Sequence, residues 1–462
     1  MPLSALDPIP DPVVHADALV ASVDACLAAG FARLGSDQRA GLASLARAFA
    51  GTPLAEPVAA ATKALSGGGA REDHLVALAA ARESLLGAAH DALLAQACAA
   101  LDGAVAAPAE AAAAGPGDAP AELAGFMSST RQWLVEVALA GLGQLDSQTV
   151  LPFAATLAAL QAQPALARLA ALLTGFVDEL DEHVPTAAMS DLPTRRWADL
   201  WSRALLGAYR LAPAPAQTKV SGTLRVLGAD LRHHDHAVSL VAYGLLDPGA
   251  GERLVRATVT AWKVDAVAGD EVWTALEHGA GPLLSALAEH KLLAIQDMTL
   301  LDSGDLVWGT AAKLGKAFDP MDAALAAFSS GAGVPIPLLP ARDRHPVQLA
   351  LPVAGAGGKL TERAGVPTLE LAGATLPLAP TSPLLGLGPA ELAKADQVFG
   401  LLRFDAGRWR LAPLLAKGKA QGKAQPGLIG PGASIARARK ISKSARTLAI
   451  LQERAGKLLR SS

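Results

Sequence analysis

Cysteine is nearly absent from the sequence, and its scarcity excludes two kinds of small scaffold. Only Cys26 and Cys98 occur in 462 residues. Two cysteines are too few for a cysteine-rich zinc module, and they do not indicate a disulfide framework. Both lie in Ala- and Leu-rich stretches with helical spacing, so we expect two buried free thiols.

Aromatic residues are also scarce, at 4% of the chain, whereas hydrophobic residues make up 51%. Alanine and leucine supply most of that fraction, which favours helices and excludes a globally disordered chain. The chain is longer than a domain built around a single hydrophobic core usually is, so about two to four domains are expected. Heavy use of Ala, Gly, Pro and Arg indicates a GC-rich bacterial genome.

Long apolar runs and a secretory signal are missing as well. The N-terminal stretch has no basic segment before an apolar core. Mean hydropathy is +0.31, but the longest uncharged runs, 147–167 and 371–390, are interrupted by Pro, Gln, Ser or Thr. No run therefore predicts a transmembrane helix. We expect a soluble cytoplasmic protein without a membrane span.

Motifs that would identify a chemistry are lacking. The segment GAGGKL at 355–360 is similar to a phosphate-binding loop, but Val353 replaces its first Gly and Leu360 its Ser or Thr. Motifs of serine hydrolases, zinc proteases and kinases are absent too. The sequence therefore favours a protein without enzymatic activity, while leaving an enzyme open. It predicts no catalytic residue and no cofactor.

The hydrophobic period divides the chain into a helical half and a β-rich half. We expect an α+β multidomain protein with an Ala/Leu-rich helical N-terminal half, a central small β-barrel-like domain, C-terminal β hairpins and a basic helical tail. The expected divisions are a helical block (1–103), an Ala/Pro/Gly linker (104–121), a second helical block (122–211), a β-rich central domain (220–330), a Pro/Gly-rich β region (331–415) and a basic linker with an amphipathic helix (416–462).

The central domain shows the element order β-β-β-α-β-β. The strands are expected at 222–231, 236–245, 253–264, 292–301 and 305–309, with a helix over 270–290 after the third strand. A five-stranded, partly open barrel of the OB-like kind has this order, and other small barrels share it. The clearest hairpin lies farther on, over 397–415, with its turn at Asp405-Ala406-Gly407.

Three of the ten histidines fall within four residues of the central domain. His233, His234, Asp235 and His236 combine imidazoles with a carboxylate, which are ligands of zinc and similar metals. On a strand, alternate side chains point to opposite faces, so at most two or three of them converge. A solvated hairpin turn explains the same polarity. A metal site in a metal-dependent enzyme is the alternative interpretation.

Trp197 and Trp201 are four residues apart and share one face of a predicted helix. Arg203 is among the arginines that border this face. Aromatic and arginine side chains together are typical of protein interfaces. These three residues are therefore candidates for binding a partner, and an anchor within the core or between domains is the alternative.

Charge is strongly segregated along the chain. From Lys417 onward there are eleven Lys or Arg and one acid, so this tail carries +10 and the remaining chain −13. A basic amphipathic helix, expected over 436–459, binds nucleic acid, an anionic membrane or an acidic partner groove. The acidic body itself, including the acids at 178–182, is a further counterpart. The candidate tail-binding residues are Arg437, Arg439, Lys440, Lys443 and Arg446.

These patterns favour a non-enzymatic interaction or scaffold subunit of a bacterial, cytoplasmic multiprotein system, whose partner is another protein. A nucleic-acid-binding protein that uses the OB-like domain and the basic tail is the first alternative. The metal-dependent enzyme built on the histidine cluster is the second. The sequence indicates no oligomeric state.

Overall fold

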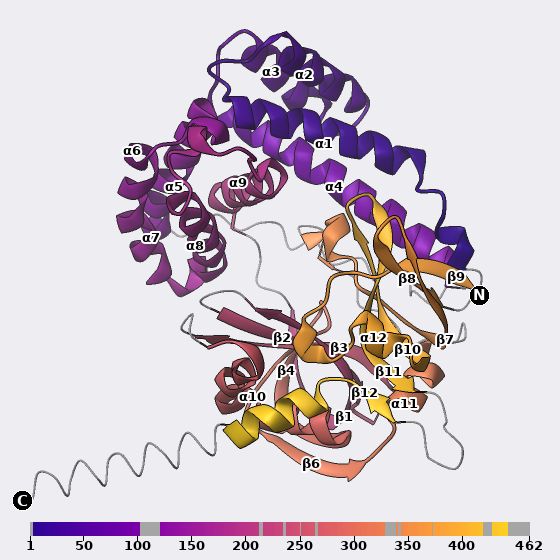
Figure 1. The fold of residues 1–462 in the computed structure, drawn as a ribbon. Coiled ribbons are helices and arrows are strands. Elements are labelled where there is room, and N and C mark those ends of the chain that lie inside the picture. The colour runs from indigo at the N-terminus through magenta and orange to yellow at the C-terminus, as the bar shows by residue number, and fades with distance from the viewer. Residues whose placement is uncertain are drawn as a thin grey trace, which may run out of the picture.

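The computed structural model describes residues 3–101, 121–211, 216–233, 237–249, 251–263, 267–328, 339–340, 343–371, 373–418 and 427–441. An N-terminal helical half is followed by two β-sheets (Figure 1). The predicted fold class, an α+β multidomain protein with a central barrel-like domain, is confirmed.

The helical half consists of Ala- and Leu-rich helices. They are α1 (Asp11–Ala29), α2 (Ser36–Ala48), α3 (Ala55–Ser66), α4 (Glu72–Ala100), α5 (Ala121–Ala140), α6 (Ser147–Val150), α7 (Ala154–Gln161), α8 (Ala167–Asp181) and α9 (Thr194–Tyr209). Helix α1 packs along α4, which continues down to the β-sheets (Figure 1).

One hydrophobic core joins the helices on both sides of the predicted linker. Its members include Leu27 of α1, Leu78 of α4, Leu134 of α5, Leu173 of α8 and Leu205 of α9, all buried. The two predicted helical blocks therefore contribute to the same core. Residues 102–120, which hold nearly all of the predicted linker, lie outside the described part of the chain.

The first sheet follows the predicted order β-β-β-α-β-β and adds one strand. Its elements are β1 (Gln217–His233), β2 (Ala237–Asp247), β3 (Arg253–Trp262), α10 (Val272–Glu289), β4 (Lys291–Leu301), β5 (Asp305–Val307) and β6 (Ala312–Ala317). Strand β1 pairs with both β2 and β4, and β5 pairs with β4 and, in parallel, with β3. Five strands therefore curl into a small barrel, and β6 extends it beyond β4.

The second sheet has the order β12-β11-β10-β7-β8-β9. Its strands are β7 (Leu351–Arg363), β8 (Val366–Leu371), β9 (Ala374–Pro377), β10 (Ala395–Asp405), β11 (Arg408–Gly418) and β12 (Leu428–Ile429). The predicted hairpin is β10–β11. Its turn residues Ala406 and Gly407 have φ of 48° and 72°, as a two-residue hairpin turn of this kind requires.

The two sheets contact each other where β1 of the barrel meets β11. A Cβ atom on Gly228 would lie 2.7 Å from the carbonyl oxygen of Leu414, so only glycine allows this approach. Leu227 and Tyr243 of the barrel pack there with Phe399 of β10, beneath helix α11 (Pro320–Phe328). The outer face of β1 and β2 is thereby covered at one end.

By length and composition, α1 is apolar enough to cross a membrane, as is the bent stretch 147–161 with 164–181 if it is counted as one span. Core helices of soluble proteins meet the same criterion. In this structure α1 buries eight residues against its neighbours, including Asp24.

Candidate functional site at the junction of the two halves

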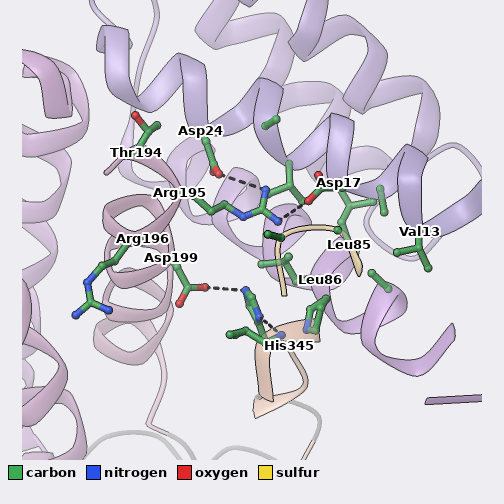
Figure 2. A pocket seen from close by; sticks show the side chains of 18 of the residues that line it. Val13, Asp17, Asp24, Leu85, Leu86, Thr194, Arg195, Arg196, Asp199 and His345 are labelled. Carbon is green, nitrogen blue, oxygen red and sulfur yellow. Dashed lines mark hydrogen bonds and ion pairs between the residues drawn. The ribbon is translucent and has the colours of Figure 1, made fainter. Parts of the chain in front are cut away.

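A cavity of about 1260 Å³ lies where the helical half meets the second sheet (Figure 2). Helices α1, α4 and α9 form one side, and residues 345–347 with the turn of β10–β11 form the other. Most lining side chains are apolar, for example Val20, Leu85 and Phe404. We call this space the junction cavity.

Beneath the lining of the junction cavity is Arg82 of α4, whose side chain is 0% exposed and which pairs with two lining residues, Asp24 and Asp199. Its Nε lies 2.7 Å from Oδ1 of Asp24, and its Nη1 lies 2.8 Å from Oε1 of Glu83. Nη1 also lies 3.4 Å from Asp199 and donates to Ser202. Burial disfavours the charged guanidinium, but these carboxylates outweigh burial and hold the pKa of Arg82 above its ordinary value.

The acids around Arg82 are affected by the same burial. It raises the pKa values of Asp24 and Glu83, and the nearby Arg82 guanidinium offsets only part of this rise. Arg195, which is 42% exposed, lies nearer the opening and bridges Asp17 at 2.8 Å and Asp24 at 3.6 Å (Figure 2). Charged groups at the cavity therefore form a connected network and not isolated ions.

Residues 343–348, which we call the strap, cross from the β-rich half to the helices. Asp343 forms ion pairs with Arg168 of α8 and Arg203 of α9. Arg344 lies 3.0 Å from Asp91 of α4. Each of these consecutive side chains thus fixes the strap to a helix, and the strap becomes one wall of the junction cavity.

His345 of the strap is the imidazole at the cavity. Its Nδ1 accepts a hydrogen bond from the backbone N–H of Val347, so the proton is on Nε2, which points at Asp199 from 3.5 Å (Figure 2). Burial lowers the pKa of His345 to about 4, although Asp199 acts in the opposite direction. The ring is therefore neutral at neutral pH.

The predicted partner-binding residues lie behind this cavity. Trp197 and Trp201 are both 0% exposed. Their indole N–H groups donate to Glu179 at 3.1 Å and to the carbonyl of Leu134 at 2.9 Å. This packing agrees with the interpretation as a core anchor, and neither ring is accessible to a partner here. Arg203 lies 3.6 Å from Asp199 and contacts the strap.

The predicted histidine cluster is only partly described. His233 is the last residue of β1 and is exposed, whereas His234, Asp235 and His236 lie outside the described residues. Within the described ranges no three His, Cys, Asp or Glu side chains are grouped so that they could hold a metal ion. Metal binding by this cluster stays a prediction.

The basic tail begins on the chain's own acids. Residues 432–441 are helical, and Arg437 lies 2.5 Å from Asp270 while Arg439 lies 3.0 Å from Glu277 of α10. Hydrogen bonding to Arg437 lowers the pKa of Asp270. Lys440 is on the same helix, and Lys443 and Arg446 lie outside the described residues. The acids that receive this part of the tail are on η6 (Gly269–Glu271) and α10, not at 178–182.

The sequence did not predict the charged residues at and beneath the junction cavity. Asp24, Arg82 and Asp199 are far apart along the chain, and no motif joins them. A signal was nevertheless present, since Arg82 is a charge that lies at helical spacing among the apolar residues Leu78, Ala79, Leu85 and Leu86. Because an unpaired charge is not tolerated in a core, such positions indicate a buried partner.

Comparisons with protein-family models, with curated proteins and with solved structures found no match to this chain.

Proposed function

We propose that the chain is a non-enzymatic interaction subunit of a bacterial, cytoplasmic system and that it holds a segment of a partner protein in the junction cavity. The observation that carries this proposal is the exposure of large apolar side chains at the cavity. Val14 of α1 is 58% exposed and Val347 of the strap is 53% exposed. Exposed apolar surface beside a concavity is typical of a surface that a partner covers.

The size of the junction cavity supports a polypeptide segment over a metabolite. Pockets for drug-sized ligands are about 300–1,000 Å³, and the junction cavity is about 1260 Å³. Its apolar lining from α1, α4 and β10 suits aliphatic or aromatic side chains inserted from an extended strand or a helix.

The charges at the junction cavity favour a basic partner segment. Four carboxylates line it, those of Asp17, Asp24, Asp199 and Asp405, against the two guanidinium groups of Arg195 and Arg196. His345 adds no charge at neutral pH, because burial lowers its pKa to about 4. The segment we propose therefore combines apolar side chains with at least one Lys or Arg.

Selection from a library of displayed random peptides on the immobilised full chain tests this proposal. We expect the enriched peptides to be apolar and basic, and to lose binding to Val14→Asp and to Val347→Asp. Val307→Asp is the matched control, because Val307 is 51% exposed but lies on β5, away from the cavity. Failure to enrich peptides, or equal binding to all three variants, would overturn the proposal.

A separate part of the proposal concerns the central barrel. Its circuit β1-β2-β3-β5-β4, with a helix between β3 and β4, supports the OB-like prediction. Barrels of the OB kind bind oligonucleotides or oligosaccharides across the face of their second and third strands. For the second candidate function, nucleic-acid binding, we therefore propose a binding surface on β2 and β3.

A further inference from the structure

Trp262 is the most exposed large hydrophobic side chain among the described residues, at 81%. It is the last residue of β3 and lies opposite Ala237 of β2 in the barrel. A solitary exposed tryptophan at the end of a regular strand leaves a large apolar ring in water. This exposure needs an explanation that packing within the barrel does not supply.

The residues around Trp262 form one outward surface across three strands. Thr260 of β3 pairs with Ser239 of β2, which pairs with Arg232 of β1. Thr260 donates a hydrogen bond of 3.0 Å to the Ser239 hydroxyl, so the row is ordered. Thr258 is also exposed on the same side of β3. Trp262, Thr260, Thr258, Ser239 and Arg232 make up what we call the Trp262 face.

Only this end of the outer surface of β2 and β3 is open. At the other end Tyr243 and Leu254 are buried against α11 and the second sheet. The covered end holds the barrel against the rest of the molecule. The Trp262 face is therefore a fixed surface on regular strands. A ligand can bind there without a change in the conformation of the barrel.

The charge of the Trp262 face is positive, although the body of the chain is acidic. Arg232 has a 57% exposed side chain and lies 3.2 Å from Asp230. That single carboxylate is shared, because Arg403 of β10 also approaches it to 2.6 Å. Two guanidinium groups thus accompany one carboxylate, and a net positive charge remains beside the exposed indole.

We propose that the Trp262 face binds single-stranded nucleic acid, with a base stacked on the indole of Trp262 and Arg232 directed at a backbone phosphate. Stacking needs an unpaired base, which a single strand offers and a duplex does not. The hydroxyl groups of Thr260 and Ser239 lie between the ring and the cation, and that of Thr258 is one step farther along β3, where they can bond phosphate or base edges. Arg232 is two strands across and two residues along from Trp262, a separation of roughly 12 Å between Cα positions.

Barrels of this kind bind oligonucleotides or oligosaccharides. The guanidinium group of Arg232 favours an oligonucleotide. A neutral oligosaccharide also stacks on an exposed tryptophan and accepts hydrogen bonds from a guanidinium group, but it gains no charge attraction and releases no counterions. A polyanion gains affinity by releasing counterions, and that part of its binding weakens steeply with salt. This inference rests on the OB-like proposal for the barrel and is independent of the junction cavity.

Within the described part of the basic tail, the helix over 432–441 is already paired with the chain's own acids. Arg437 and Arg439 form ion pairs with Asp270 and Glu277, and their helix packs on α10. Nucleic-acid binding through the Trp262 face therefore requires no release of this helix. The sequence-based expectation combined the OB-like domain with the basic tail, and our proposal places the stacking site on the barrel alone.

Fluorescence anisotropy with a labelled single-stranded oligonucleotide of mixed sequence, at about 50 mM salt, tests the proposal on the full chain. We expect Trp262→Ala to weaken binding roughly 5- to 100-fold, the loss associated with one base–aromatic stack. Arg232→Gln should lower the slope of log affinity against log salt by about one. Tyr209→Ala is the matched control, because Tyr209 is an aromatic residue of α9 that is 54% exposed and far from the barrel face.

Circular dichroism and the thermal midpoint establish that each variant is folded, and Trp262→Phe should retain most of the affinity because its ring still stacks. Absence of binding by the wild-type chain at this salt, or equal binding by Trp262→Ala, would overturn the proposal. Duplex binding as tight as single-strand binding would also overturn it.

Salt-independent binding of a neutral oligosaccharide that Trp262→Ala abolishes would assign the face to sugar instead. Val14→Asp should leave oligonucleotide binding unchanged, so this result is separate from the test of the junction cavity.

Discussion

At the scale of single residues, Arg82 is the buried cation that pairs with the carboxylates of Asp24, Glu83 and Asp199 next to the junction cavity. Replacing it by methionine removes the cation closest to both Asp24 and Glu83 and leaves Asp24 only its longer contact of 3.6 Å with Arg195. We expect Arg82→Met to lower the free energy of unfolding by about 3–5 kcal/mol, measured by urea denaturation. Arg71→Met is the control, because Arg71 pairs with Asp73 at the surface with 67% of its side chain exposed.

The control should cost far less, because a fully solvated surface ion pair contributes little to stability. Equal losses in the two variants would contradict the assignment of Arg82 to a buried network. Adding Asp24→Asn to Arg82→Met should recover part of the loss, because it removes the charge left unpaired. A double-mutant cycle with these substitutions measures that coupling.

His345 makes the stability of the strap depend on pH. Its pKa is lowered from 6.5 to about 4 in the folded chain, so the unfolded chain binds the proton first as the pH falls. The contribution of the neutral ring is complete above pH 6.5 and is lost progressively toward pH 4, by at most about 3 kcal/mol. Burial is the main cause of this lowered pKa; the charges of Arg82, Arg195 and Arg203 add to it, and that of Asp199 opposes it.

The urea midpoint of His345→Gln should therefore change less between pH 7.5 and pH 4.5 than that of the wild-type chain. The glutamine keeps a polar group toward Asp199 and has no titrating ring. An equal change in both proteins would mean that other groups cause the acid sensitivity. His15→Gln is the control, because this histidine lies on exposed surface of α1.

At the scale of elements, Gly228 fixes how closely the two sheets approach. A Cβ atom at this position would lie 2.7 Å from the Leu414 oxygen and 2.8 Å from its Cβ. Gly228→Ala should lower the free energy of unfolding by about 1–3 kcal/mol, the usual cost of overpacking. Gly125→Ala is the matched control: Gly125 is exposed in α5 with open space around it, so alanine should stabilise the chain by up to about 1 kcal/mol.

Thermal unfolding of both variants checks this prediction, and equal signs for the two changes would contradict it. The position also shows what a strand pattern leaves out. Alternation in 222–231 predicted a strand there, but a pattern along one strand carries no information on which other strand crosses it. The glycine within the strand was the available signal for a close approach.

Elements with a strong period could be predicted from the sequence, and others could not. The alternation of Arg253–Trp262 and the turn at Ala406-Gly407 predicted β3 and the β10–β11 hairpin. Strand β6 was missed, because five of its six residues are exposed and it has no apolar alternation. Within the predicted Pro/Gly-rich β region, strands β8 and β9 form a hairpin whose turn includes Gly373 at φ 81°, and no periodic pattern marked this hairpin in the sequence.

The candidate site was less predictable than the elements, for a physical reason. Helical periodicity gave α1, α4 and α9 but not their mutual placement, on which the meeting of Asp24, Arg82 and Asp199 depends. His345 belongs to a short segment without a period at all. Trp262 was visible in the sequence, but its exposure follows from the covering of only one end of the barrel face.

At the scale of the whole molecule, α4 links the two halves. Its N-terminal part, with Leu75 and Leu78, belongs to the core of the helical half. Its C-terminal part, with Leu93 and Ala97, belongs to the core of the barrel and the second sheet. Leu85, between the two parts, packs against both cores. A continuous helix therefore couples the halves mechanically.

Gly87, just after Leu85, is where this coupling can be tested. The wild-type chain should unfold in one calorimetric transition, because unfolding either core removes half of α4 from the other. Gly87→Pro removes a helical hydrogen bond and kinks α4, at a cost of about 3 kcal/mol, so the single transition should separate into two.

Gly87→Ala is the matched control: the nearest atom to its Cβ would be 3.9 Å away. It should keep one transition, with a higher midpoint because alanine favours helix. A single transition in Gly87→Pro would show that the strap and the apolar contacts between the halves couple them without a continuous α4.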